Sequence, residues 1–257
     1  MKVLVVGDIV GNGGRRIFAS VAKRLRDEKA VHVIVANAEN AAAGNGLTLA
    51  LAEELFKAGA DAITLGDHVW GQKEFEGNIG SDKRIVRPAN FPPGVPGFGA
   101  TTIQTALGPL SVVNILGRVF MNPMDCPFRT MDAVLKTLPA NAPILVDFHA
   151  EATSEKIAMG HYLDGRVTAV VGTHTHVQTS DATILPKGTA YMTDLGMTGP
   201  SHSVIGRTIE PVLKKFLTGV PAKFDVATGP NVLEGAIINI DRTTGQAVSI
   251  APYRWHE

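Results

Sequence analysis

The chain contains 257 residues, and its 24 Lys and Arg balance its 24 Asp and Glu. A chain of this length can bury a sizeable core as one α/β domain, which we expect to span residues 1–257. The balanced charge predicts no bulk nucleic-acid binding. The single cysteine, Cys126, excludes an internal disulfide and a thiolate metal cluster. No apolar run reaches the roughly 18 residues of a membrane span, so we expect an unprocessed cytoplasmic protein without a membrane partner.

Strand-like and helix-like patterns alternate in the first part of the chain, which predicts parallel strand pairing. The glycine-rich stretch 11–14 matches neither the dinucleotide pattern nor a phosphate loop ending in Gly-Lys-Ser/Thr, so we interpret it as the turn into the first helix. Thr48 is a capping residue for the second helix. The expected strands are 3–6, 31–36 and one that starts at Ala62, and the expected helices are 14–28 and 48–58.

The second part of the chain begins with a stretch rich in Pro and Gly, residues 87–99, which we interpret as a surface excursion within the domain. Two strands with antiparallel character follow at 100–106 and 110–116, then a Pro-rich loop to residue 128. The stretch 194–206 is predicted as a loop. Further strands are expected at 143–148, 167–171, 182–185 and 189–193, helices at 153–163 and 207–217, and a terminal hairpin of 235–241 with 247–250.

Five of the apolar runs end in side chains of the kinds that bind metal ions. In an extended segment, side chains two residues apart leave the same face, so His174 and His176 can point into one cavity. In open α/β sheets, ligands bind beyond the carboxyl ends of the strands, and we expect all of these side chains to meet there. They are, in chain order, Asp8, Glu39, Asn40, Asp67, His68, His149, His174 and His176.

This set of four imidazoles, three carboxylates and one amide exceeds the needs of a single divalent ion, which takes about four to six ligands. The surplus favours two ions, which need a bridging carboxylate and can share a water of lowered pKa. A Ser or Cys nucleophile is disfavoured, because Cys126 has no neighbouring base and no Gly-x-Ser-x-Gly motif occurs. A purely structural zinc site is also disfavoured, because such sites are usually rich in thiolates.

The motifs around these residues resemble the calcineurin-like metallophosphoesterases, and specifically the YmdB-like bacterial family. The resemblance runs nearly end to end and is specific when the motifs are taken together. The motifs are Gly7-Asp8, Asn37-Ala-Glu39-Asn40, Gly66-Asp67-His68, Phe148-His149, Gly172-Thr-His174-Thr-His176, Leu116 to Met121, Asp194 to Pro200 and Ser203 to Gly206.

The resemblance implies a four-layer αββα fold and a dinuclear centre of iron (Fe²⁺/Fe³⁺) or Mn²⁺. It also implies hydrolysis of phosphodiesters, notably 2′,3′-cyclic nucleotides, by a metal-bridging hydroxide, with His68 as the proton donor to the leaving oxygen. The expected partner is a small nucleotide substrate, and a homo-oligomer is compatible with the sequence. By the same resemblance, the first ion would be held by Asp8, Glu39, Asn40 and His176, and the second by Glu39, Asp67, His149 and His174.

Position 67 departs from the family pattern, which has Asn there. An Asn amide binds metal through oxygen and donates through N–H, whereas an ionised Asp67 cannot donate. Asp67 raises the number of carboxylates in the proposed ligand set from two to three. The added negative charge should lower the electrophilicity of the metal centre or favour an ion of higher valence.

Two alternatives stay open at this point: a phosphomonoesterase of broad specificity, and a metal-bound signalling or RNA-associated scaffold with little turnover. Arg118 and Arg129 are either sources of positive charge for a substrate or solvated surface residues. We expect the pocket walls to come from the loops 88–99, 118–130 and 194–206.

Overall fold

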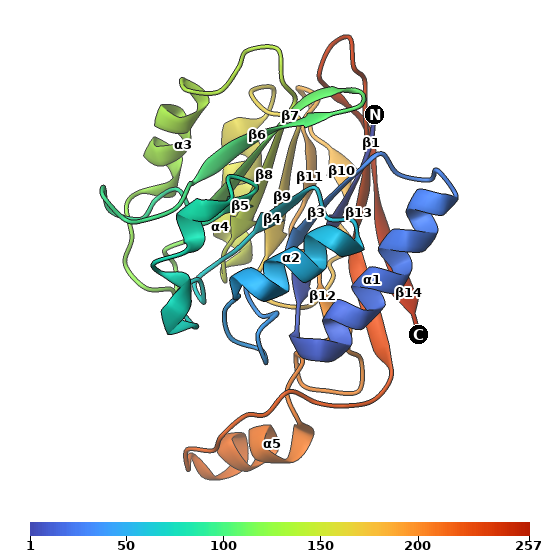
Figure 1. The fold of residues 1–257 in the computed structure, drawn as a ribbon. Helices are drawn as coiled ribbons and strands as arrows, with labels where there is room; N and C mark the ends of the chain where they lie inside the picture. Colours follow the sequence, from blue (N-terminus) through green and yellow to red (C-terminus); the bar gives the residue numbers. More distant parts are fainter.

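The computed structural model describes residues 1–257, and its centre is a pair of mixed β-sheets (Figure 1). The first sheet consists of β1 (Lys2–Val6), β2 (Asp8–Ile9), β3 (Val33–Asn37), β4 (Ala62–Thr64), β5 (Ile85–Val86), β12 (Met197–Pro200), β13 (Asn231–Ile240) and β14 (Ala247–His256). Its order is β2-β12-β13-β1-β3-β4-β5, with β14 paired to β13. Strands β1, β3, β4 and β5 are parallel, as the alternating pattern predicts, and β13 runs antiparallel to β1.

The second sheet consists of β6 (Ala100–Thr105), β7 (Gly108–Leu116), β8 (Ile144–His149), β9 (Ala169–Thr173), β10 (Thr183–Ile184) and β11 (Ala190–Met192). Its order is β10-β11-β9-β8-β7-β6. The pair β6 and β7 is antiparallel, as predicted, whereas β7, β8, β9 and β11 are parallel.

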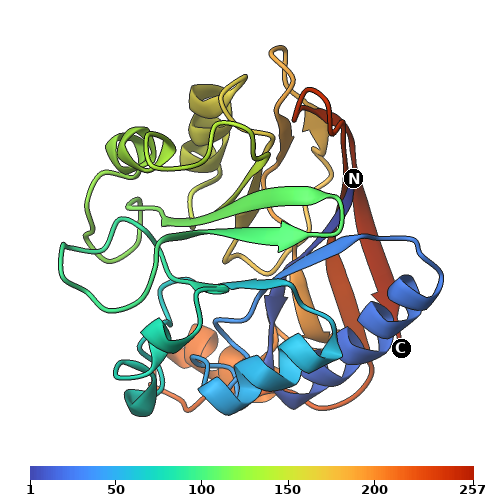
Figure 2. The same cartoon turned by 45° about the horizontal axis from the view of Figure 1, so that its top comes forward.

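Helices cover the outer face of each sheet, and Figure 2 shows the two helical layers on opposite sides of the strands. The helices are α1 (Gly11–Asp27), α2 (Leu49–Ala58), α3 (Pro127–Leu135), α4 (Thr153–Leu163) and α5 (Ile209–Thr218), with short 3₁₀ turns at Lys73–Phe75 and Ile79–Ser81. Helices α1 and α2 lie over the first sheet, and α3 and α4 over the second. Helix α5 projects from the body (Figure 1).

The alternation of side chains along β1 shows how the layers are held together. Leu4 and Val6 point to one face and pack with α1 and α2, whereas Val3 and Val5 point to the other face and pack between the two sheets. A third apolar cluster lies between the second sheet and α3 and α4. The chain is therefore a single-domain α/β fold with the expected four layers. The expected domain bounds, residues 1–257, stay a prediction.

Most predicted elements agree with the structure, and the differences lie mainly where contacts between distant parts of the chain determine the secondary structure. The helix predicted at 153–163 is α4, and Thr48 caps α2 through a 3.2 Å hydrogen bond from the Leu51 amide to Oγ1. The predicted loop 194–206 is partly wrong, because Met197–Pro200 forms β12 between β2 and β13. The terminal hairpin is longer than predicted, and α3 was not predicted.

The glycines at 11–14 form the first turn of α1, and not a turn that precedes it. A Cβ atom on Gly13 would lie 2.2 Å from Asn231 Oδ1, and one on Gly14 would lie 2.2 Å from the Thr198 carbonyl oxygen. The glycines therefore let the start of the helix approach β12 and β13.

No helix in the structure is both long enough and apolar enough to cross a bilayer.

Candidate metal centre

The eight side chains singled out in the sequence come together at the carboxyl ends of β1, β3, β4, β8 and β9. We call these eight residues the strand-end cluster. Its buried members are Asp8, Glu39, Asn40 and His149, and its half-buried members are Asp67, His68, His174 and His176.

One half of the strand-end cluster gathers around Nε2 of His149. This atom lies 3.1 Å from Asp67 Oδ1, 3.3 Å from Glu39 Oε2 and 3.0 Å from His174 Nδ1. One ligand atom from each of the four residues lies within 4.8 Å of the others. Two imidazole nitrogens and two carboxylate oxygens that converge in this way match the donor set of divalent transition metals.

The other half of the cluster contains Asp8, Asn40 and His176. Asp8 Oδ1 lies 3.6 Å from His176 Nε2 and, although buried, has no hydrogen-bond partner. A buried carboxylate oxygen without a partner is costly, so the position fits a cation. Glu39 lies between the halves, because its Oε1 is 2.9 Å from Asn40 Nδ2 and its Oε2 faces His149.

The amide of Asn40 is turned away from the role that the family resemblance implies. Its oxygen lies 2.8 Å from His68 Nδ1, and its Nδ2 lies 3.3 Å from His176 Nε2. Binding of a cation through the Asn40 oxygen on the side of Asp8 therefore requires the amide to rotate.

The charges of the cluster are mutually dependent. Burial opposes ionisation of Asp8, Glu39 and Asp67, but the adjacent histidines outweigh it and lower the pKa of each carboxyl group. Burial also disfavours the charged forms of His149 and His176, and the same carboxylates outweigh it and raise the pKa of both. The imidazoliums thus supply positive charge where cations would supply it.

A hydrogen-bond chain behind His149 determines which of its nitrogens carries the proton. The Thr173 hydroxyl donates to Asp147 Oδ1 at 2.6 Å and lies 2.9 Å from His149 Nδ1. Because the hydroxyl has only one hydrogen, its oxygen must accept from Nδ1–H. Nε2 of a neutral His149 is then left with a lone pair that faces Glu39 and Asp67. Burial raises the pKa of Asp147 to about 6.

The segment that carries His174 and His176 is not the extended strand that we predicted. Strand β9 ends at Thr173, and φ is +99° at His174 and +64° at His176. Such angles cost about 1–3 kcal/mol each in non-glycine residues. Both imidazoles nevertheless reach the cluster, because Asp194 holds Thr175 from behind. Asp194 Oδ2 accepts from the Thr175 hydroxyl at 2.7 Å and from the buried Lys156 ammonium at 2.6 Å.

A cavity of about 330 Å³ opens over the cluster, and part of its wall was missed in the sequence. Ile205 lines it together with cluster residues and belongs to the loop 194–206, which we expected as a wall, whereas Arg207 and Phe224 lie outside the expected loops. The Ile205 carbonyl lies 3.0 Å from His176 Nδ1, which ties this wall to the cluster. Single residues of ordinary types carry no periodic or motif signal, so nothing in the sequence pointed to Arg207 or Phe224.

The loops 88–99 and 118–130 do not line this cavity, so two of the three expected walls are wrong. Arg129 lines a separate hollow with Phe91. The Arg118 amide donates to Glu155, and its side chain is exposed, which agrees with the surface alternative.

Comparisons with known proteins agree with this architecture. A family model described as YmdB-like protein matches residues 4–253. The chain is 47% identical over 251 residues to the 2′,3′-cyclic-nucleotide 2′-phosphodiesterase of Bacillus subtilis (strain 168), with 97% of this chain and 95% of that protein covered.

Two crystal structures are similar over nearly their whole length. A hypothetical protein from Thermus thermophilus has a TM-score of 0.94 and 44% identity, with 100% of both chains covered. A novel phosphatase from Mycoplasma pneumoniae has a TM-score of 0.94 and 34% identity, with 100% of this chain and 94% of that chain covered. This chain therefore belongs to the YmdB-like protein family.

Proposed function

We propose that the protein is a dinuclear metal-dependent phosphodiesterase that hydrolyses 2′,3′-cyclic nucleotides. The observation that carries the proposal is that ligand atoms of Glu39, Asp67, His149 and His174 lie within 4.8 Å of one another. The similarity of the chain to a 2′,3′-cyclic-nucleotide 2′-phosphodiesterase supports the choice of substrate. The unpartnered Asp8 Oδ1 beside this group supports a second ion.

The proposed ligands follow the two halves of the strand-end cluster, and Glu39 belongs to both. Mixed nitrogen and oxygen donors suit iron or manganese. When bound, two such cations would neutralise the phosphate oxygens and lower the pKa of the water molecule that attacks phosphorus. The proposed sets are Asp8, Glu39, Asn40 and His176 for one ion, and Glu39, Asp67, His149 and His174 for the other.

His68 is the proposed proton donor. Its Nδ1 lies 3.3 Å from Glu39 Oε1, a contact that orients the ring, and its side chain is 40% exposed. Hydrogen bonding to Glu39 raises the pKa of His68, which favours the imidazolium form. The ring would give its Nε2 proton to the ribose oxygen as the bond between that oxygen and phosphorus breaks.

A phosphomonoesterase is the second candidate, favoured by the similarity to a Mycoplasma pneumoniae protein described as a phosphatase. Rates with p-nitrophenyl phosphate, bis-p-nitrophenyl phosphate and cyclic nucleotides separate the two activities. A metal-bound signalling or RNA-associated scaffold would bind metal and turn over none of them.

The deciding experiment combines elemental analysis of the purified protein with a 2′,3′-cyclic-nucleotide assay before and after chelation. We expect about two ions per chain, hydrolysis that chelation abolishes, and recovery with Fe²⁺ or Mn²⁺. Hydrolysis that persists at full rate after complete removal of metal would overturn the proposal.

A cytoplasmic location and a homo-oligomer stay predictions.

A further inference from the structure

Next to the candidate metal centre lies a second hollow that the proposed chemistry does not use. Its volume is about 620 Å³, and it shares His68, Arg207 and Phe224 with the cavity over the strand-end cluster. We call the residues 205–207 and 223–226, which border these two spaces, the outer wall. The two spaces are therefore neighbours, and a ligand whose reacting group lies at His68 has room to extend along the outer wall.

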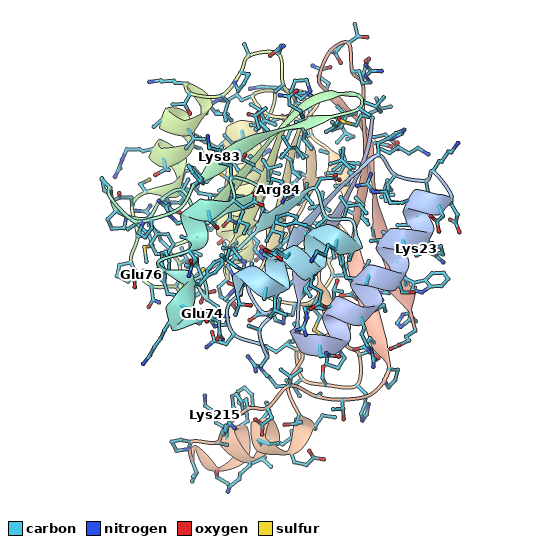
Figure 3. The ribbon with its side chains drawn as sticks, viewed as in Figure 1. Lys23, Glu74, Glu76, Lys83, Arg84 and Lys215 are labelled. Atoms are coloured by element: carbon cyan, nitrogen blue, oxygen red, sulfur yellow. The ribbon has the colours of Figure 1, made fainter.

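Phe224 offers an aromatic surface at the junction of the two spaces. The residue is half-buried and borders both spaces. The Lys215 ammonium lies 5.2 Å from the centroid of the Phe224 ring, and Figure 3 labels Lys215 on α5. The contact with α5 helps to hold the ring in place at the junction.

Arg207 brings positive charge to the same junction. Its guanidinium donates to the carbonyl oxygens of Gly44 and Phe224, and no carboxylate forms an ion pair with it. The nearby Asp225 pairs with Lys223 at 3.2 Å. The charge of Arg207 is thus available to an anion at the junction of the two spaces.

From these contacts we infer that the second hollow binds the nucleoside part of the substrate, with the base stacked on Phe224 and Arg207 facing the phosphate. The inference rests on the proposed function and deepens it. The hollow has enough room for a nucleoside. Stacking accepts every base because each has a π-face, so adenine, guanine, cytosine and uracil substrates should be used within about tenfold of one another.

The test compares adenosine 2′,3′-cyclic phosphate with methyl ribofuranoside 2′,3′-cyclic phosphate, which has the same reacting group and no base. The variant Phe224→Leu keeps an apolar side chain but removes the aromatic face. We expect it to lower kcat/KM for the nucleotide roughly 5- to 100-fold, mainly through KM, and to change kcat/KM for the base-free substrate less than about twofold.

The matched control is Phe216→Leu, the same chemical change on α5 at a side chain that is 81% exposed and lines neither space. This variant should leave kcat/KM unchanged for both substrates. Arg207→Gln should instead lower kcat/KM for both substrates by a similar factor, roughly tenfold, because both carry the phosphate. Elemental analysis and the thermal midpoint of each variant verify that the metal centre and the fold persist.

Binding of adenosine 3′-monophosphate, measured by calorimetry, separates this inference from the proposed function. If the metal-loaded protein hydrolyses neither cyclic phosphate but Phe224→Leu weakens binding of the monophosphate, the activity is wrong and the nucleoside site stands. If both substrates are hydrolysed and Phe224→Leu affects them equally, or leaves binding unchanged, the nucleoside site is wrong and the activity stands.

Discussion

The strand-end cluster and the outer wall meet at His68, but they are built in different ways. Ligands of the cluster lie at the ends of parallel strands or directly after them. Thr173 and Thr175, which adjoin these ligands, donate hydrogen bonds to the buried carboxylates of Asp147 and Asp194 behind the cluster. The outer wall lies outside both sheets and is continuous with the projecting helix α5. Sheet pairing constrains a strand end on both sides, whereas loops tolerate change. The chemistry and the recognition of substrate should therefore be separable by mutation.

His68 lies where the two regions meet, and its removal should have the largest effect. We expect His68→Ala to lower kcat for adenosine 2′,3′-cyclic phosphate roughly 10²- to 10⁴-fold, because the ribose oxygen loses its proton donor as it leaves. Metal content, measured by elemental analysis, should not change. The control His161→Ala alters an exposed side chain on α4 and should have no effect. A variant that loses its metal together with its activity would show that His68 holds the cluster and is not a proton donor.

Thr173 tests whether the cluster depends on its buried support. Thr173→Val should weaken binding of one metal ion roughly 10- to 100-fold, because the Nδ1–H group of His149 loses its acceptor and the tautomer is no longer fixed. Metal titration gives the affinity, and ¹⁵N chemical shifts of His149 report the tautomer. Base preference, a property of the outer wall, should not change.

The matched control for this prediction is Thr198→Val. The Thr198 hydroxyl is also buried but has no hydrogen-bond partner, so its loss should cost little. Equal metal affinity in both variants would mean that the chain through Asp147 has no part in binding.

The stability of the metal-free protein should depend on pH through the cluster. The pKa values of His149 and His176 are raised by nearby carboxylates that outweigh burial, so their stabilising contribution is complete below about pH 6.5 and is lost as pH rises through the raised values. Asp147 acts in the same direction at lower pH, between about 4 and 6, because burial raises its pKa to about 6.

Urea unfolding in the presence of a chelator should thus show a free energy of unfolding that falls as pH rises above about 6.5, by an amount on the order of a few kcal/mol. Saturating Mn²⁺ should remove most of this dependence, because cations then supply the positive charge. A metal-free protein that becomes more stable over the same range would contradict this account of the cluster.

Substitution of Asp67 should have the smallest effect on the rate of hydrolysis. Its Oδ1 lies 3.1 Å from His149 Nε2 and 3.4 Å from His174 Nδ1, so it adds a third carboxylate to the cluster. Asp67→Asn restores the residue expected for the family, and we expect a roughly two- to tenfold rise in kcat, corresponding to about 1 kcal/mol, or a changed metal preference. Rates with Fe²⁺, Mn²⁺ and Zn²⁺ measure both. Identical rates with every metal would leave Asp67 without an electronic role.

The sequence by itself determined where the chemistry gathers. Apolar runs identify buried strands, their alternation with helices predicts parallel pairing, and parallel strands end at a common edge. Each of these properties is local, or follows from the direction of the chain. The meeting of Asp8, Glu39 and His149 could therefore be predicted even though these residues are far apart in the sequence. Their roles as ligands, and that of His68 as the acid, stay predictions.

Only the tertiary structure decided how the cluster is held and what lies beside it. The left-handed backbone at His174 and His176 is held by Asp194, which accepts from Thr175 and is itself bound by the Lys156 ammonium from elsewhere in the chain. Strand β12 exists because β2 and β13 supply its partners. Arg207 and Phe224 border the site because loop packing places them there. Such features depend on distances between elements remote in sequence, which are set by packing and carry no local pattern.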